Sequence, residues 1–389
     1  MAIADKLTQL NTIKGDIKAA IIAKGGTATD DMTTYATAIS NLPSGGGGGN
    51  TDLVDLIERD ITNINIPSEV TKIGDYAFYN SNLVSATIPN SVTSIGFRAF
   101  EGSANLANIS IGNSVTSINH YAFYGCNSLT SVTLPDSVTT IGGSVFENCQ
   151  NLTTVDLGDS VTTINSEVFR NCYSLVSVTI PDSVHLISNN MFYNCRSLEF
   201  TIPDSVTQIG NHAFFGCNSL VNLVIPDSVT SIGESAFQTC TGLTSVTLPN
   251  TITSLGNSVF RACTGLLSIT IPDSVTSIGG TTFLGCTSLT SVTIPNSVTK
   301  IGQSAFNGCS GLTSVTIGNS VTSIGASVFL GCRLLTSFTC NATTPPTISS
   351  NTFQNVPADC AIYVPAESVA AYKAASYWST RAAYIQAIP

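Results

Sequence analysis

The chain has 389 residues, carries a formal net charge of −10 at pH 7, and contains only 10% charged residues. This acidic balance disfavours a general binder of nucleic acid or of an anionic membrane, and no stretch approaches the roughly 18 consecutive apolar residues of a membrane span. Because an average globular domain has about 25% charged residues, we expect a surface built mainly from Ser, Thr, Asn and backbone.

Residues 1–43 differ from the rest of the chain and are predicted to form two short helices. The apolar residues of the first helix recur at helical spacing: Leu7, Leu10, Ile13, Ile17 and Ile21. Gly25 and Gly26 stop this helix, and the second is expected to end at Pro43. Faces this narrow bury too little to fold alone, so we interpret residues 1–43 as a helical anchor that attaches to a partner surface or to copies of itself.

Residues 44–50 include five consecutive glycines and are predicted to be a flexible linker. A short helix over residues 53–60 is expected to cover the open first coil of the region that follows. The first residues of the chain lack the apolar core of a secretory signal peptide, so export by a general secretion route is not expected.

Residues 51–340 are dominated by a repeated unit of about 23 residues, which is clearest from Leu243 to Gly265. One phenylalanine recurs in each unit: Phe78, Phe100, Phe123, Phe146, Phe169, Phe192, Phe214, Phe237, Phe260, Phe283, Phe306, Phe329 and Phe353. A fixed period of this length predicts a solenoid, in which each coil buries its apolar side chains only against the neighbouring coils.

The sequence of one unit predicts the structure of its coil. The inward positions of a first short strand are Leu243, Val246 and Leu248. A Pro-Asn turn follows, and a second short extended piece is expected over residues 252–255. Phe260 and Cys263 are expected to close the coil on one helical or 3₁₀ turn.

The repeat pattern L-x-x-V-x-I-P-x-x-V-x-x-I-G-x-x-A-F-x-x-C resembles the BspA-like class of leucine-rich repeats over about residues 61–353. The resemblance implies a right-handed leucine-rich-repeat solenoid. Residues 341–389 are expected to form the last coil and a C-terminal cap similar to the one that follows such repeats. The cap should contain a strand at Ile362 and a helix from Ala366 to Trp378, with Val369, Tyr372 and Tyr377 available for burial. The N-terminal anchor resembles the attachment helices of phage tail and fibre proteins.

Ten of the twelve cysteines stand three residues after a repeat phenylalanine: Cys126, Cys149, Cys172, Cys195, Cys217, Cys240, Cys263, Cys286, Cys309 and Cys332. Stacked side chains that point the same way suit disulfide geometry poorly, so we expect a ladder of buried free thiols. Zinc would need clustered cysteine or histidine partners, and none occur. Cys340 and Cys360 fall outside the ladder, and a disulfide between them is left open.

Two polar columns have structural explanations. A threonine occupies one position of the second strand in eleven units, with His185 as its exception, which invites an ice-binding hypothesis but also suits any exposed strand. A turn column interleaves aspartate with asparagine. One carboxylate per coil does not make a calcium site, so we interpret these residues as turn formers.

No residues point to catalysis, and neither a cofactor nor a metal is expected. His120, His185 and His212 lie in different units without a paired nucleophile. Phosphate-binding and dinucleotide-binding glycine motifs are lacking. We therefore predict a protein that is not an enzyme.

The candidate binding residues flank the repeat phenylalanines of the early units, where aromatic residues and arginine replace Ser and Thr. They are Tyr124, Arg170, Tyr193, Phe215, Tyr121 and His120. This composition is typical of binding hot spots, although packing between coils would also explain it. A strip of such side chains could hold a glycan by ring stacking or a protein by apolar anchoring.

Three hypotheses for function follow. The first is a structural phage virion protein (a tail, baseplate or head fibre) that contacts other virion proteins through residues 1–43 and a host cell-surface glycan or protein through the solenoid. The second is a bacterial BspA-like adhesin at the cell surface, and the third is an intracellular scaffold. Self-association is an open alternative for the partner, whereas nucleic acid and a membrane span are not expected.

Overall fold

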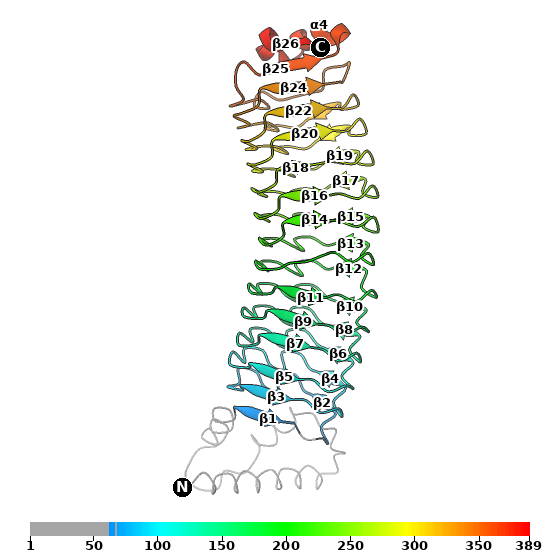
Figure 1. Ribbon diagram of the computed structural model, residues 1–389, viewed down its shortest axis with the longest axis vertical. Helices are drawn as coiled ribbons and strands as arrows, with labels where there is room; N and C mark the ends of the chain where they lie inside the picture. The colour runs from blue at the N-terminus through cyan, green and yellow to red at the C-terminus, as the bar shows by residue number, and fades with distance from the viewer. Residues whose placement is uncertain (1–61, 67) are drawn as a thin grey trace. The chain divides into compact units, whose positions relative to one another are not determined.

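The computed structural model describes residues 62–66 and 68–389. The anchor, the glycine linker and the cap helix expected at residues 53–60 lie outside the described residues. The chain divides into two compact units, Met1–Ile164 and Asn165–Pro389. Each unit is a stack of coils made of short parallel strands, which Figure 1 labels in order.

The first unit contains two series of strands, one on each side of its coils. The first series is β1 (Asn63–Asn65), β3 (Ser85–Thr87), β5 (Asn108–Ser110), β7 (Ser131–Thr133) and β9 (Thr154–Asp156). The second series is β2 (Lys72–Ile73), β4 (Ser94–Ile95), β6 (Ser117–Ile118), β8 (Thr140–Ile141) and β10 (Thr163–Ile164). Strands of each series pair in parallel and join equivalent residues of successive coils, such as Ile73 with Ile95 and Ile95 with Ile118.

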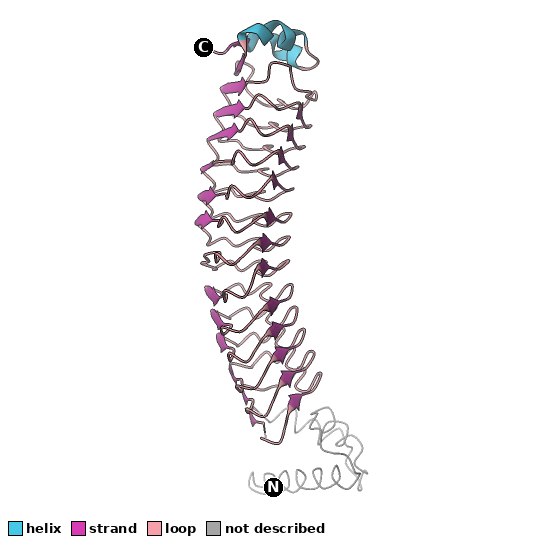
Figure 2. Ribbon diagram, turned by 90° about the vertical axis from the view of Figure 1, so that its right-hand side faces the viewer, coloured by secondary structure: helices cyan, strands magenta, loops and turns pink. Residues whose placement is uncertain are grey.

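The second unit repeats this arrangement and ends in a cap. Its first series is β11 (Ser177–Thr179), β14 (Asn222–Val224), β16 (Ser245–Thr247), β18 (Ser268–Ile269), β20 (Ser291–Ile294), β22 (Ser314–Ile317), β24 (Ser337–Cys340), β25 (Ala361–Val364) and β26 (Ile385–Ala387). Its second series is β12 (Leu186–Ile187), β13 (Gln208–Ile209), β15 (Ser231–Ile232), β17 (Ser254–Leu255), β19 (Ser277–Ile278), β21 (Lys300–Ile301) and β23 (Ser323–Ile324). Figure 2 shows the strands in magenta and the capping helices in cyan.

The core consists of one apolar column for each inward position of the repeat. Leu243, Val246 and Leu248 are buried as predicted, because side chains alternate across a strand. The repeat phenylalanines stack face to face in each unit, with ring centroids 5.2 Å apart for Phe100 and Phe123 and 5.3 Å apart for Phe192 and Phe214. The solenoid fold class predicted from the sequence is confirmed.

The prediction of a helical or 3₁₀ turn around the repeat phenylalanine is wrong. The residues two before and two after it have positive φ, for example Ser235 (56°) and Thr239 (58°) around Phe237. Successive backbone amides of this turn alternate between an acceptor in the same coil and one in the next. Gln238 N donates to Ser235 O within the turn, whereas Phe237 N donates to Val259 O of the next coil. This alternation bonds each coil to the next, and a continuous helix would abolish it.

The cysteines of the ladder are buried free thiols, as their column predicts. Thiols of the ladder donate to the carbonyl of the phenylalanine one coil earlier, such as Cys217 Sγ to Phe192 O at 3.1 Å and Cys240 Sγ to Phe214 O at 3.1 Å. Ser103 takes the cysteine position in its coil and donates to Phe78 O at 2.8 Å. This position of the repeat therefore accepts a small hydrogen-bond donor, which can be a thiol or a hydroxyl.

The C-terminal cap confirms a strand at β25 but corrects the single helix expected from Ala366 to Trp378. The segment forms η1 (Ala366–Ser368), α4 (Val369–Ala374) and η2 (Trp378–Tyr384). Tyr377 breaks the helix at φ 63° and lies exposed, and Trp378 is buried in its place. Trp378 Nε1 donates to Pro346 O at 2.8 Å, which fixes the cap on the preceding coil.

Cys340 and Cys360 do not form the disulfide that the sequence left open, since both are free thiols. The Tyr372 hydroxyl donates to Cys340 Sγ at 3.2 Å and to Ala342 O at 2.8 Å. Cys360 lies beside Arg381, whose guanidinium donates to the carbonyls of residues 353, 356 and 357. The two thiols therefore belong to different contacts of the cap.

The exposed threonine column joins coils through its hydroxyls. Thr116 Oγ1 donates to Thr93 O at 3.2 Å, and Thr299 Oγ1 donates to Thr276 O at 3.3 Å. A hydroxyl that is directed to the neighbouring backbone serves coil stacking, which favours the structural explanation over ice binding.

Candidate binding surface

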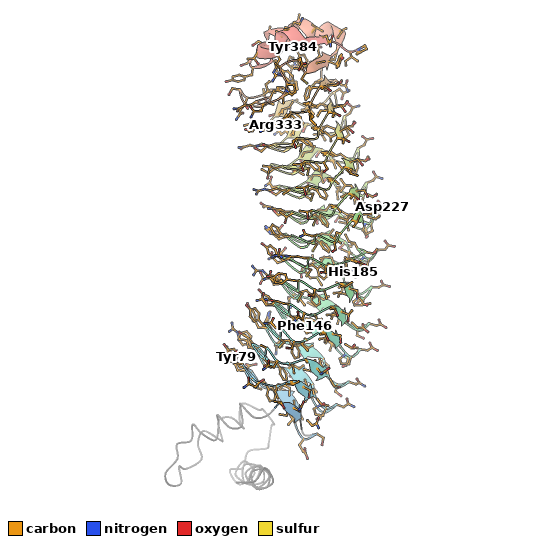
Figure 3. All side chains as sticks on the ribbon, turned by 60° about the vertical axis from the view of Figure 1, so that its left-hand side comes forward. Tyr79, Phe146, His185, Asp227, Arg333 and Tyr384 are labelled. Carbon is orange, nitrogen blue, oxygen red and sulfur yellow. The ribbon has the colours of Figure 1, made fainter. Side chains whose placement is uncertain are left out.

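The turns of the first unit carry a cluster of aromatic side chains outside the core. Its members, which we call the tyrosine cluster, are Tyr76, Tyr79, Phe97, Arg98, Tyr121 and Tyr124. Tyr76 meets Tyr79 and Phe97 edge to face, with centroids 5.7 and 5.5 Å apart. Tyr121 likewise meets Phe97 at 5.8 Å and Tyr124 at 5.9 Å. The rings thus form one connected group over three coils, and Figure 3 labels Tyr79 at its exposed side.

Arg98 links two rings of the tyrosine cluster. Its guanidinium carbon lies 5.0 Å from the ring centroids of both Phe97 and Tyr121, within the range of cation–π contacts. Arg98 Nε also lies 3.2 Å from Glu101 Oε2. Burial raises the pKa of Glu101, and the charge of Arg98 opposes that rise. The positive charge of Arg98 is therefore largely engaged within the cluster.

The second unit holds a different arrangement, in which side chains of successive coils stack. Tyr193 and Phe215 are nearly parallel, with ring centroids 4.5 Å apart and an interplanar angle of 7°. The Arg170 guanidinium carbon lies 5.2 Å from the Tyr193 centroid. Both neighbours of Tyr193 in its column thus contact its ring, and all three side chains are half-buried.

A second cation–π pair joins the same two coils in the opposite direction. The Arg196 guanidinium carbon lies 4.8 Å from the Tyr173 ring centroid, so each coil supplies one arginine and one tyrosine. Tyr173 and Arg196 were not among the binding residues predicted from the sequence. Their shared position directly after the ladder cysteine could have identified them, because most units carry Asn, Thr or Ser there.

The predicted site residues therefore fall into two groups. Tyr121 and Tyr124 belong to the tyrosine cluster of the first unit, whereas Arg170, Tyr193 and Phe215 form the stack of the second. His120 is exposed next to the tyrosine cluster, and its Nδ1 accepts a hydrogen bond from Gly143 N at 2.8 Å. This bond gives His120 a structural contact between coils.

Of the other two histidines, His185 lies apart from both groups, and His212 lies beside the stack of the second unit. His185, which Figure 3 labels, lies on the exposed threonine column, and its Nδ1 is 2.8 Å from Ser205 O. The His212 ring centroid is 6.1 Å from that of Phe215. Neither contact resembles a catalytic pair.

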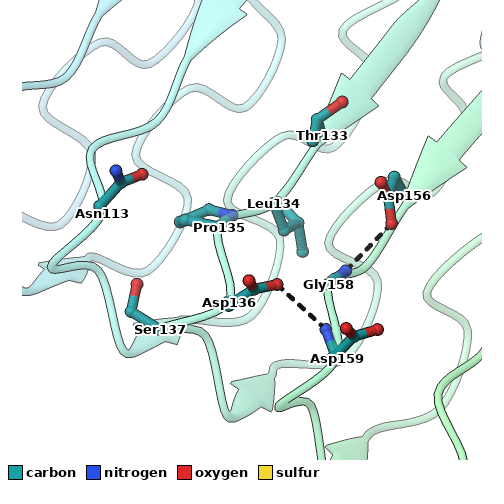
Figure 4. A pocket seen from close by; sticks show the side chains of 9 residues that line it. All are labelled: Asn113, Thr133, Leu134, Pro135, Asp136, Ser137, Asp156, Gly158 and Asp159. Atoms are coloured by element: carbon teal, nitrogen blue, oxygen red, sulfur yellow. Dashed lines mark hydrogen bonds between the residues drawn. The ribbon is translucent and has the colours of Figure 1, made fainter.

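A shallow depression of about 490 Å³ lies on the turn side of the first unit, lined by Asp136, Asp156 and Asp159 (Figure 4). Asp136 Oδ1 accepts from Asp159 N at 3.2 Å, and Asp156 Oδ1 accepts from Gly158 N at 3.2 Å. The bond of Asp136 agrees with the assignment of its column to turns, and Asp156, at the end of β9, makes a similar bond. Within the described residues, no group of three or more His, Cys, Asp or Glu side chains is placed to hold a metal ion.

The described chain is a leucine-rich-repeat solenoid by its architecture. The family model for the BspA type leucine rich repeat region matches residues 57–176, 162–289 and 253–370. The chain therefore belongs to the BspA-type leucine-rich repeat family. Proteins of this family and fold are typically non-enzymatic binding scaffolds.

Solved structures of leucine-rich repeat proteins are similar to this chain. A leucine-rich repeat protein from Bacteroides ovatus ATCC 8483 is 25% identical, with a TM-score of 0.57 and 78% of this chain and 91% of the other covered. One from Eubacterium ventriosum ATCC 27560 is 24% identical, with a TM-score of 0.52 and 75% and 86% covered. A leucine rich cell surface protein from Faecalibacterium prausnitzii A2-165 is 32% identical, with a TM-score of 0.42 and 66% and 87% covered.

Two further findings concern relatives and membrane spans. None of the curated proteins compared with the chain is significantly similar to it. Among the described residues, no helix is both long enough and apolar enough to cross a lipid bilayer.

Proposed function

We propose that this protein is a non-enzymatic adhesion protein, whose solenoid displays a recognition surface on the turns that flank the repeat phenylalanines. The observation that carries the proposal is the replacement of small polar turn residues by aromatic residues and arginine in the early units. The tyrosine cluster and the Arg170, Tyr193 and Phe215 stack have the composition of binding hot spots.

The alternative explanation is that these side chains only pack coil against coil. Against it stands the exposure of Tyr76 and Tyr79, whose side chains are 49% and 43% exposed. The late units also stack well without aromatic residues at these positions, using Leu284 and Leu330 after the repeat phenylalanine. The aromatic residues therefore exceed what coil stacking requires.

We further propose that residues 1–43 attach the solenoid to a phage virion, in its tail, baseplate or head, and that the solenoid contacts the host surface. The support is the resemblance of the anchor to attachment helices and the glycine linker at residues 44–50. The family favours a second candidate, an adhesin anchored at a bacterial surface, because BspA-type repeat proteins are often found there.

Paired substitutions test the recognition surface. Tyr124→Ala with Tyr193→Ala should weaken binding of the full chain to bacterial cells, whereas Leu284→Ala with Leu330→Ala should retain it. Circular dichroism controls for folding of both variants. Equal cell binding by the two folded variants would refute the recognition surface.

Deletion of residues 1–43 tests the attachment. The truncated chain should keep its solenoid and fail to copurify with phage particles. Copurification with the bacterial envelope, and never with particles, would replace the virion by the cell-surface candidate. Loss of the solenoid fold on truncation would show that the segment is a cap and not an anchor.

A further inference from the structure

Three members of the tyrosine cluster occupy a backbone position that disfavours large side chains. The residue two before the repeat phenylalanine has positive φ in twelve coils: Tyr76, Arg98, Tyr121, Ser144, Glu167, Asn190, His212, Ser235, Ser258, Thr281, Ser304 and Ser327. Glycine and asparagine tolerate this left-handed conformation best, and bulky side chains are uncommon in it. Most coils accordingly use a small residue. The first three described coils instead carry Tyr76, Arg98 and Tyr121.

Core packing does not offset this unfavourable conformation. The core of these coils is filled by Phe100 and Phe123, which stack with each other. Tyr76 and Tyr79 stay largely exposed, and Tyr121 is half-buried among the rings of the cluster. Tolerated strain together with exposed aromatic surface is typical of functional positions.

The chemistry of the cluster favours a cation as its ligand. An edge-to-face pair uses the edge of one ring, so that ring's π face stays available to another group. Residues 62–164 contain seven acidic but only two basic side chains, Lys72 and Arg98, and Arg98 is paired with Glu101. Exposed tyrosine faces in an acidic surrounding attract Lys or Arg side chains.

Other occupants fit this surface less well. Sugar hydroxyls require convergent hydrogen-bonding groups, but the amides here are engaged: Tyr76 N donates to Phe97 O, and Tyr121 N donates to Gly143 O. A second copy of this chain, with a net charge of −10, would approach a unit in which acidic side chains outnumber basic ones. A basic protein surface satisfies both constraints.

We propose that the tyrosine cluster is the docking surface for a protein that presents Lys or Arg side chains next to apolar ones. This proposal rests on the proposed adhesion function and names the class of partner. Partner cations stack on the rings of Tyr76 and Tyr79, and the apolar neighbours cover the remaining ring surface.

Selection from a random-peptide display library on the immobilised full chain tests the proposal. The variant is Tyr76→Asn with Tyr79→Asn, since asparagine accepts the left-handed conformation. Its matched control is Ser327→Asn with Leu330→Asn, the same two positions of a late coil. Circular dichroism verifies that both variants are folded.

We expect enriched peptides to combine Lys or Arg with aromatic or aliphatic residues. Their affinity should fall about tenfold in the Tyr76→Asn, Tyr79→Asn variant and stay unchanged in the control. It should also fall as NaCl rises from about 0.05 to about 0.5 M, because salt screens exposed charges. Binding that depends on the cluster with this salt response supports the proposal.

Four results would overturn the proposal, and they separate it from the adhesion function. Acidic or uncharged peptides that depend on the cluster would refute the basic partner only. Peptides that bind both variants equally would place recognition elsewhere on the solenoid. A glycan array on which binding is lost in the Tyr76→Asn, Tyr79→Asn variant would make the partner a sugar, whereas no ligand in either assay would refute the adhesion function as well.

Discussion

Cysteine at the ladder position combines three properties: small size, low polarity and a donor for a carbonyl one coil away. The carbonyl of Phe192 accepts both Cys195 N at 3.0 Å and Cys217 Sγ at 3.1 Å. From the sequence, a serine there should be costly because a hydroxyl would meet apolar neighbours. Ser103 shows that the column can hold a hydroxyl when it finds this acceptor.

Two substitutions of Cys217 separate the contribution of its hydrogen bond to stability from the contribution of its side-chain volume. Cys217→Ser should lower the free energy of unfolding by less than about 1 kcal/mol, because the hydroxyl keeps the bond to Phe192 O. Cys217→Ala should cost about 1–3 kcal/mol, since it removes the donor and leaves a small cavity. Urea denaturation measures both. A serine variant less stable than the alanine variant would show that the hydrogen bond contributes little.

At the scale of the coil, close backbone approach limits what each turn accepts. A Cβ on Gly279 would lie 2.6 Å from the backbone carbon of Gly256 and 2.7 Å from the nitrogen of Asn257, one coil earlier. A Cβ on Gly256 itself would meet its nearest atom at 3.6 Å, which is ordinary contact. Two glycines of one column therefore have different roles.

The prediction is a large difference between two identical substitutions. Gly279→Ala should destabilise the protein by about 1–3 kcal/mol, because the ladder must shift to admit the methyl group. Gly256→Ala should stay within about 0.5 kcal/mol of the wild type. Thermal unfolding under identical conditions compares them. Equal stability of the two variants would mean that coils separate more easily than their hydrogen bonds imply.

The sequence predicted the elements of the coil well where periodicity determines them. Inward positions such as Val246, the stacked phenylalanines and the thiol ladder follow from one repeat aligned on itself. The turn around the repeat phenylalanine was mispredicted, because propensity favours a local helix while the bonds to the next coil require left-handed residues. The expected burial of Tyr377 was wrong for a related reason, since this residue adopts a left-handed conformation that leaves it exposed while the neighbouring Trp378 is buried.

The candidate site was predictable only in part. Its column positions follow from the repeat, so that Arg170, Tyr193 and Phe215 were expected to align. Whether aligned rings offer their faces or bury them depends on side-chain rotamers, which periodicity does not determine. The stack around Tyr193 occupies that ring, whereas the edge-to-face pairs of Tyr76 leave ring surface available.

At the scale of the whole molecule, the thiol ladder makes stability depend on alkaline pH. Burial raises the pKa of Cys149, Cys240, Cys286 and Cys332 from 9.0 to about 12. Above pH 9 the unfolded chain releases these protons while the folded chain keeps them, so the free energy of unfolding falls as pH rises. Each such thiol contributes a loss of about 1.4 kcal/mol per pH unit between these two pKa values.

Urea midpoints at pH 7 and near pH 10 should therefore differ, with the lower midpoint at alkaline pH. Cys240→Ser removes one of these thiols and should make the pH dependence shallower. Midpoints that do not change with pH would show that the thiols are less buried than the ladder requires.

The central claim is that the aromatic side chains on the left-handed turn positions serve recognition and are not needed for packing. Tyr76→Asn tests it most directly, with Ser304→Asn as the control at the equivalent position of a late coil. Asparagine relieves the backbone conformation, while a ring that is 49% exposed gives up only edge contacts worth about 0.5–1.5 kcal/mol.

The measurement combines urea unfolding with binding to bacterial cells for each variant. We predict that Tyr76→Asn stays within about 1 kcal/mol of the wild type in stability and loses about tenfold in binding, and that Ser304→Asn keeps both. A stability loss of about 3 kcal/mol or more, as for truncation of a core aromatic residue, with binding unchanged, would contradict the account.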